Sequence, residues 1–222
     1  MKILAFDTST EACSVALAVE DTVRARVVHG QQHSTQILSM VDELLGEAGL
    51  RLNQLDALAF GRGPGLFTGL RIGAGVVQGL AFGADLAVVP VSSLAALAQG
   101  QEADRVLAAL DARMSQVYWG AYTRGVDGIV ELTGAECVTA PEDVPVPTSG
   151  NWLGVGSGWD RYADALALRV GTRLTGWASN CYPQARDVAR LGRVGLARDQ
   201  AVTPERALPV YIRDEVARKQ GP

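Results

Sequence analysis

The order of strand-like and helix-like patterns in the first 92 residues constrains the fold most strongly. Three short apolar segments, KILAFDTST (a strand with a turn), ACSVALAVE and TVRARVVHG, follow one another with short links. Links this short join antiparallel neighbours, because a parallel pair needs a crossover of a dozen or more residues. The beginning of the chain therefore predicts an antiparallel meander of three strands.

Helix and strand patterns alternate after this meander. Residues 34–46 have the spacing of an amphipathic helix, LDALAFGRG is typical of a strand, residues 69–83 form a second helix pattern, and LAVVPV forms a fifth strand. This order, β-β-β-α-β-α-β, is that of a ribonuclease-H-like α/β unit. New strand patterns then begin with RVLAALDA, MSQVYWGAYTR and GIVELTGAECVT. We therefore expect two ribonuclease-H-like lobes, over 1–102 and 103–205, and a C-terminal helix at about 206–222 that can pack back on the first lobe.

Composition and charge exclude several classes of protein. The formal net charge is −4, and the arginines near the C-terminus are interleaved with acidic residues, which favours a solvated mixed-charge face over an autonomous nucleic-acid binder. The three cysteines are far apart, with neither CxxC nor HExxH in the chain, so no metal site and no disulfide framework are expected. No apolar run reaches the roughly 18 residues of a membrane span. We expect a cytoplasmic protein without a membrane anchor.

The stretch GRGPGLFTGLRIG, residues 61–73, holds five glycines and leads into the second helix pattern. It differs from a P-loop, because Leu70 stands where the lysine after Gly69 would be. It also differs from a Rossmann fingerprint starting at Gly63, because residue 68 is a threonine. Pro64 and Gly65 instead predict a type II turn with Gly65 at positive φ. The stretch is thus a weak phosphate cradle, and close approach of two backbones is the favoured interpretation.

The helix pattern over 69–83 is apolar on almost all sides, which indicates burial on almost all sides. Its glycines each cost about 0.8–1 kcal/mol relative to alanine, so their grooves point to close packing against another backbone. One interpretation keeps this packing inside the monomer. The favoured one is a protein–protein interface shared with the helix at 34–46, which also has a broad apolar face. Its candidate residues are Ile37, Met40, Val41, Leu44, Gly69, Ile72, Gly73, Val76 and Leu80.

Two aspartates, Asp7 and Asp111, each end the first strand of a predicted lobe. The turn after Asp7 is rich in hydroxyl groups and could hold a phosphate or a hydrated Mg²⁺. Taken alone, an aspartate that stabilises a tight turn is the more common explanation. An actin-like ATPase, however, places two such aspartates around its phosphates. An ATPase or small-molecule kinase that uses Asp7 and Asp111 is therefore the alternative function.

Six segments, in order along nearly the whole chain, resemble the bacterial TsaB (YeaZ) family: ILAFDTSTEACSVAL, QHSTQILSMVDELL, GRGPGLFTGLRIGAGVVQGLAF, VPVSSLAALA, DARMSQVYWG and VGSGW. The resemblance implies the two-lobed α/β fold of the actin-like and Hsp70-like (ASKHA) superfamily. It also implies a noncatalytic partner of the paralogue TsaD. With TsaE, this pair attaches a threonylcarbamoyl group to the adenosine next to the anticodon of tRNA.

The same resemblance implies which sites are kept and which are lost. Ser93 and Leu97 stand where the paralogue has the two histidines of its metal site, so neither a metal site nor a catalytic residue is expected. A vestigial nucleotide cleft is implied at Asp7, Thr8, Ser9, Thr10 and Asp111. No cofactor is expected to bind tightly, with ATP or ADP and Mg²⁺ bound weakly in the complex. The two helices are expected to pair with those of TsaD, or with a second copy of the chain when TsaD is absent, and tRNA is contacted mainly as part of the complex.

Overall fold

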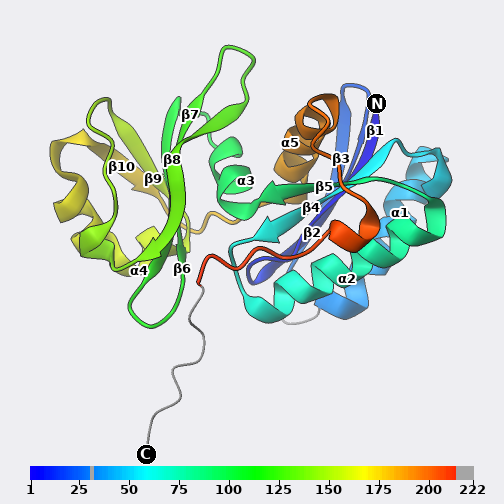
Figure 1. Ribbon diagram of the computed structural model, residues 1–222, viewed down its shortest axis with the longest axis horizontal. Coiled ribbons are helices and arrows are strands. Elements are labelled where there is room, and N and C mark those ends of the chain that lie inside the picture. The colour runs from blue at the N-terminus through cyan, green and yellow to red at the C-terminus, as the bar shows by residue number, and fades with distance from the viewer. Residues whose placement is uncertain (31–32, 214–222) are drawn as a thin grey trace, which may run out of the picture.

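Two five-stranded sheets form the framework of the computed structural model, which describes residues 1–30 and 33–213 (Figure 1). The first sheet has the order β3-β2-β1-β4-β5, and the second has the order β10-β9-β6-β7-β8. The strands of the first sheet are β1 Lys2–Asp7, β2 Ala12–Val19, β3 Thr22–His29, β4 Ala57–Gly63 and β5 Val88–Ser92. Those of the second are β6 Arg105–Asp111, β7 Val117–Arg124, β8 Val130–Thr139, β9 Trp152–Val155 and β10 Leu174–Ala178.

Both sheets have the same topology. In the first, β1, β2 and β3 are antiparallel neighbours, and β4 and β5 run parallel to β1. In the second, β6, β7 and β8 form the antiparallel meander, and β9 and β10 run parallel to β6. The predicted pair of ribonuclease-H-like lobes is confirmed. Together they form the actin-like ASKHA fold, with Asp7 and Asp111 at the ends of equivalent strands.

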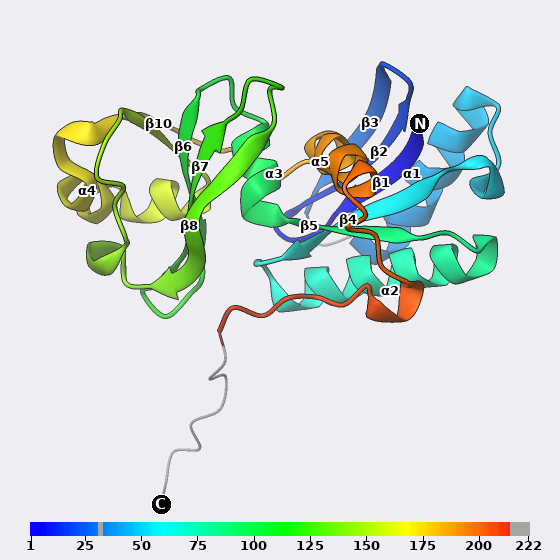
Figure 2. The same ribbon diagram turned by 45° about the horizontal axis from the view of Figure 1, so that its top comes forward.

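Helices cover both faces of each sheet (Figure 2). They are α1 His33–Ala48, α2 Phe67–Ala84, α3 Ser93–Gln99, α4 Ser157–Val170 and α5 Ala185–Ala197. Alternation along β1 sends Leu4 and Phe6 into the core beneath α1 and α2, while Ile3 and Ala5 face α5. The short helix α3 follows β5 directly and packs on the second sheet, so it joins the two lobes. Among the described residues, no helix is both long and apolar enough to cross a bilayer.

The last part of the chain differs from the expected division of the lobes. Helix α5 falls inside 103–205, yet it packs on β1, β2 and β4 of the first sheet. Small side chains explain this position, because Gly192 lies against Ala59 and brings the helix close to the sheet. The helix expected at 206–222 does not form over the described residues: Pro204–Arg206 form a single 3-10 turn, and residues 207–213 form neither helix nor strand and run from the first lobe to the turn at 112–116 of the second. The rest of that expected helix lies outside the described residues.

Candidate functional site

A cavity of about 360 Å³ lies between the lobes, where β1 and β6 end. Residues from both lobes line it: Ser9, Thr10, Glu11, Gly65 and Leu66 from the first, and Leu110, Asp111, Arg113, Ser157, Asp160 and Arg161 from the second. Three of the five residues expected in a vestigial cleft therefore meet at one cavity. The other two, Asp7 and Thr8, are buried and do not line it.

Asp7 is enclosed in the core of the first lobe. Its Oδ1 atom accepts hydrogen bonds from the backbone amide and the hydroxyl group of Ser9, at 3.0 and 2.8 Å. Its Oδ2 atom is buried and has no partner among the described residues. Burial raises the pKa of Asp7 to about 7, although the hydrogen bonds from Ser9 lower it. A Mg²⁺ ligand must present its oxygen to a hydrated ion, and Asp7 does not.

The glycine-rich stretch packs directly on the turn that follows Asp7. A Cβ atom on Gly61 would lie 2.0 Å from Oδ2 of Asp7. One on Gly65 would lie 2.3 Å from the carbonyl oxygen of Ser9, and one on Gly69 would lie 2.0 Å from that of Thr8. Leu66 also donates its amide to the carbonyl of Ser9, at 2.7 Å. The expected close approach of two backbones is present, and it lies within the chain.

The turn chemistry of this stretch differs from the expectation. The glycine with positive φ is Gly63, at 105°, and Gly65 is not among the residues with positive φ. The predicted type II turn centred on Pro64 and Gly65 is therefore wrong. Gly65 is needed for space instead, because a side chain there would collide with the backbone of Ser9.

Asp111 lines the cavity, but its charge is already paired. Its Oδ2 atom lies 3.4 Å from the guanidinium groups of both Arg113 and Arg161. Its Oδ1 atom accepts the backbone amide of Arg113 at 2.9 Å and faces the hydroxyl group of Tyr162 at 3.4 Å. These partners occupy the carboxylate that a magnesium–nucleotide complex would need. With Asp7 buried as well, the residues present do not fit a tight magnesium–nucleotide site.

The two positions at which the family resemblance implied metal ligands in the paralogue belong to the core. Ser93 and Leu97 on α3 are 0% and 1% exposed, and Leu97 packs in the apolar cluster between α3 and the second sheet. Neither a buried hydroxyl group nor a leucine replaces an imidazole ligand. Within residues 1–30 and 33–213, no three His, Cys, Asp or Glu side chains are grouped so as to hold a metal ion.

Six of the nine expected interface residues lie inside the monomer. Four belong to α1 and point into the first core cluster: Ile37, Met40, Val41 and Leu44. Gly69 and Gly73 of α2 face Thr8, whose hydroxyl group donates to the carbonyl of Gly69 at 2.8 Å. The broad apolar arc of α1 is therefore filled by its own lobe. The structure places these six residues in the core, which corrects the expected docking surface.

The outer side of α2 remains open. Ile72, Val76 and Leu80 are half-buried along it. Gly75, Gly79 and Gly83 are exposed, and a Cβ atom on any of them would find nothing within 4 Å. These six residues form what we call the α2 face. The i, i+4, i+8 spacing of its glycines was visible in the sequence, but which of the glycine pairs faced solvent was not.

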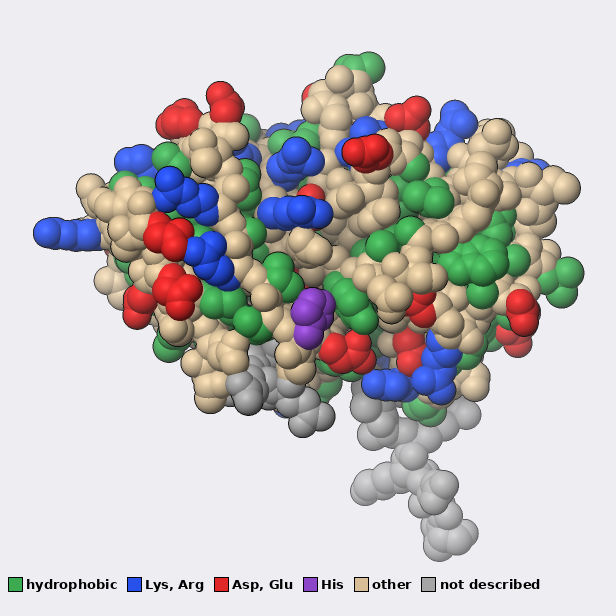
Figure 3. Space-filling model, turned by 180° about the vertical axis from the view of Figure 1, so that it is seen from behind, with side chains coloured by type: hydrophobic (Ala, Val, Ile, Leu, Met, Phe, Trp, Pro, Cys, Tyr) green, Lys and Arg blue, Asp and Glu red, His purple; other side chains and the backbone are tan. Residues whose placement is uncertain are grey.

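Charges on the surface are mixed. Arg186 lies 3.5 Å from Asp187, and Arg198 lies 3.4 Å from Glu131. Figure 3 shows basic and acidic side chains interspersed over the face seen from behind. Two of the C-terminal arginines, Arg186 and Arg198, thus have acidic partners, as expected of a mixed-charge face.

These features define a two-lobed protein of the ASKHA superfamily whose cleft offers no free strand-end carboxylate. A family model described as "TsaD: tRNA N6-adenosine threonylcarbamoyltransferase" matches residues 27–218. The chain is 44% identical to the tRNA threonylcarbamoyladenosine biosynthesis protein TsaB of Escherichia coli, over all of this chain and 99% of that protein. It is 40% identical to TsaB of Haemophilus influenzae, over all of this chain and 98% of that protein.

A solved structure supports the same relationship. "YeaZ from Pseudomonas aeruginosa" superposes with a TM-score of 0.88 and 46% sequence identity, over 95% of this chain and 99% of that one. The chain therefore belongs to the TsaB (YeaZ) family.

Proposed function

We propose that this chain is the accessory, noncatalytic subunit of the complex that makes threonylcarbamoyladenosine next to the anticodon of tRNA. The full-length relationship to proteins named for this biosynthesis carries the proposal. The cleft supports it, because Asp7 is buried and Asp111 is paired with two arginines. In this proposal the chain acts in the cytoplasm, dimerises with the catalytic paralogue TsaD and supports the binding of TsaE. It contacts tRNA mainly as part of the assembled complex.

The α2 face is the docking surface in this proposal. Its glycines leave an open strip along the helix, flanked by the half-buried side chains of Ile72, Val76 and Leu80. The distance between the axes of two packed helices depends on the side chains at the contact. Small residues therefore allow two helices to pack at a short interaxial distance. TsaD occupies this face in the complex. A second copy of the chain occupies it when TsaD is absent.

The chain alone holds no nucleotide tightly in this proposal, and ATP or ADP with Mg²⁺ binds only weakly within the complex. The geometry supports weak binding at most, since the residues of the cleft do not fit a magnesium–nucleotide complex. No step of the proposal therefore passes through a nucleotide held by this chain.

Reconstituted transfer of the threonylcarbamoyl group to tRNA tests the proposal. The mixture contains TsaD, TsaE, the synthase that makes threonylcarbamoyl-AMP, and ATP, with this chain present or omitted. Omission should reduce the product to background. The variant Asp111→Asn should restore the product as well as wild type does, because the subunit contributes no catalytic group. The proposal is contradicted if the amount of product is unchanged when this chain is omitted. It is also contradicted if the Asp111→Asn variant pairs with TsaD normally but gives no product.

The alternative is an ATPase or small-molecule kinase, and the equivalent positions of Asp7 and Asp111 at strand ends favour it. The alternative requires the isolated chain to bind magnesium–ATP. The noncatalytic proposal predicts no micromolar binding, because Asp111 is paired and Asp7 is buried. Titration calorimetry with magnesium–ATP distinguishes the two. Micromolar binding that is lost in Asp111→Asn would favour the enzyme.

A further inference from the structure

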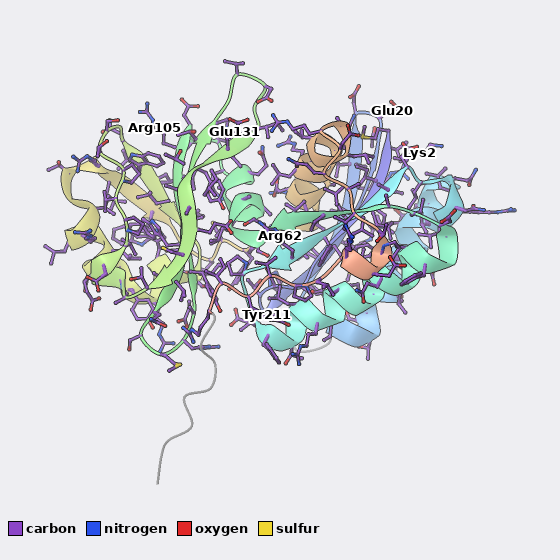
Figure 4. The ribbon with its side chains drawn as sticks, in the orientation of Figure 1. Lys2, Glu20, Arg62, Arg105, Glu131 and Tyr211 are labelled. Atoms are coloured by element: carbon purple, nitrogen blue, oxygen red, sulfur yellow. The ribbon has the colours of Figure 1, made fainter. Side chains whose placement is uncertain are left out.

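The C-terminal segment, residues 204–213, contacts both lobes. On the first lobe, the amide of Val210 donates to the carbonyl of Arg62 at 2.8 Å, and the side chain of Gln78 on α2 donates to the carbonyl of Ala207 at 3.3 Å. Figures 1 and 2 show the segment leaving α2 and running to the lower end of the second lobe. Figure 4 labels Arg62 and Tyr211 along this path. The segment thus crosses from one lobe to the other.

The middle of the C-terminal segment is fixed on the first turns of α2. The ring of Tyr211 lies 5.5 Å from that of Phe67, and its hydroxyl group accepts a hydrogen bond from Nε of Arg71 at 3.2 Å. The guanidinium group of Arg71 in turn lies 3.6 Å from the centre of the Phe67 ring. Tyr211 and Arg213 also line a cavity of about 370 Å³ together with Asp111. The position of the segment is therefore tied to the space between the lobes.

Arg213 holds the end of the segment on the turn between β6 and β7, residues 112–116. One guanidinium nitrogen donates to the carbonyl of Ala112 at 3.1 Å and to Oε1 of Gln116 at 2.6 Å. The other lies 3.4 Å from the sulfur of Met114. These acceptors stand at both ends and at the tip of the turn. A guanidinium group has several N–H donors in a fixed planar arrangement, so it can bind several separate acceptors better than the compact ammonium group of a lysine can.

The turn itself is strained and benefits from an outside contact. Arg113, Met114 and Ser115 have φ values of 62°, 53° and 56°, three consecutive non-glycine residues in the left-handed region. L-residues rarely adopt this conformation in succession, and it persists only where the surroundings fix it. Two backbone bonds between residues 112 and 116 and between 113 and 116 close the turn from within. Arg213 is the contact from the C-terminal segment.

We propose that the C-terminal segment is a clasp that sets the opening between the two lobes, fastened at Arg213. The lobes are also joined at α3, where the hydroxyl groups of Ser92 and Tyr122 both donate to Glu136. That junction acts as the hinge, because a few residues at the ends of elements absorb the backbone change in such motions, and the clasp limits rotation about it. When Arg213 releases the turn, the cleft beside Asp111 widens. This inference does not depend on the proposed function.

The test compares Arg213→Met with Arg206→Met, a matched loss of charge at an exposed arginine in the same segment. Spin labels at Asp42 on α1 and Leu168 on α4, both exposed, report the distance between the lobes once Cys137 and Cys181 are replaced by alanine. We expect Arg213→Met to lengthen the distance between the labels and to broaden its distribution. Amide exchange at Ala112 and Gln116 should rise roughly 10-fold, because the turn loses an external support.

Arg206→Met should leave both readouts at their wild-type values. Arg213→Lys should give an intermediate distribution, since a compact ammonium group replaces the planar guanidinium group. An unchanged distance in Arg213→Met overturns the clasp even if exchange in the turn increases, because the arginine would then stabilise only the turn. Equal effects of Arg206→Met and Arg213→Met also overturn it.

Discussion

Gly69 and Gly75 belong to the same helix but face different surroundings. A Cβ atom on Gly69 would lie 2.0 Å from the carbonyl oxygen of Thr8, while one on Gly75 would find nothing within 4 Å. The first glycine is required by the close approach of a loop. The second serves no contact within the monomer, and it destabilises the helix relative to alanine.

This contrast predicts opposite effects for the same substitution. Gly69→Ala should destabilise the fold by roughly 2 kcal/mol or more, because the clash is with backbone that cannot turn aside. Gly75→Ala should stabilise it by about 0.5–1 kcal/mol through helix propensity. Urea unfolding followed by far-ultraviolet circular dichroism measures both, since all four tryptophans lie in the second half of the chain. A Gly69→Ala variant as stable as wild type would refute the packing described here.

Asp7 should make the free energy of unfolding fall as the pH rises. Burial raises the pKa of Asp7 from 3.8 to about 7, so the folded chain binds a proton more tightly than the unfolded chain. Its contribution to stability is complete below the unfolded pKa and is lost as the pH rises through about 7. Between pH 5 and pH 8, wild type should lose on the order of 2–3 kcal/mol more than Asp7→Asn. Parallel pH profiles of the two proteins would contradict a raised pKa.

The position of Asp7 was predictable from the sequence, but its environment was not. The alternating pattern of β1 places it at a strand end, next to a turn rich in hydroxyl groups. Whether the carboxyl group faces solvent depends on how closely another segment approaches. That approach is set by Gly61, Gly65 and Gly69, which are distant in sequence. Local patterns therefore suggested a cleft residue where the structure has a buried one.

Among the elements, α3 has the contacts of a junction between lobes. Its N-cap residue Ser92 accepts the amide of Ala95 at 3.2 Å and donates to Glu136 on β8. Ser92 is the last residue of β5, and its hydroxyl group both caps α3 and forms a hydrogen bond with the second lobe. The network is partly buried, so its hydrogen bonds are costly to lose.

Ser92→Ala should therefore lower the free energy of unfolding by about 1–2 kcal/mol, the usual cost of a lost N-cap in proteins. Ser39→Ala on α1 is the matched control, because its exposed hydroxyl group makes only a 3.5 Å contact with Glu43. That variant should stay within about 0.5 kcal/mol of wild type. Equal stability of the two variants would remove the junction role of Ser92.

Helix existence was easier to predict than helix surroundings. The periodicity of α1 and α2 fixed both helices to within a few residues of their observed ends. The apolar arc of α1 did not reveal that side chains of its own lobe cover it. A single sequence shows how much apolar surface a helix has, but not what packs against that surface. Helix α5 illustrates the same limit. Its small residues fit the first sheet, although its place in the chain suggested the second lobe.

For the whole molecule, topology was predictable because it repeats. The short links of the first meander dictated antiparallel strands, and a second meander after residue 103 indicated a second lobe. The path of residues 207–213 was not predictable from local pattern, since contacts with α2 and with the turn at 112–116 determine it. Long-range contacts of this kind also decide which helix face stays open to a partner.

The affinity of this chain for isolated TsaD, measured by titration calorimetry, tests docking through the α2 face most directly. A Cβ atom on Gly79 would find nothing within 4 Å among the described residues, so Gly79→Leu places its side chain on the open strip of the α2 face. The side chain should weaken pairing at least roughly 100-fold, or about 3 kcal/mol, while the monomer stays folded. Asp164→Leu, an exposed change on α4, should pair as wild type does. Wild-type affinity in Gly79→Leu would contradict docking through the α2 face.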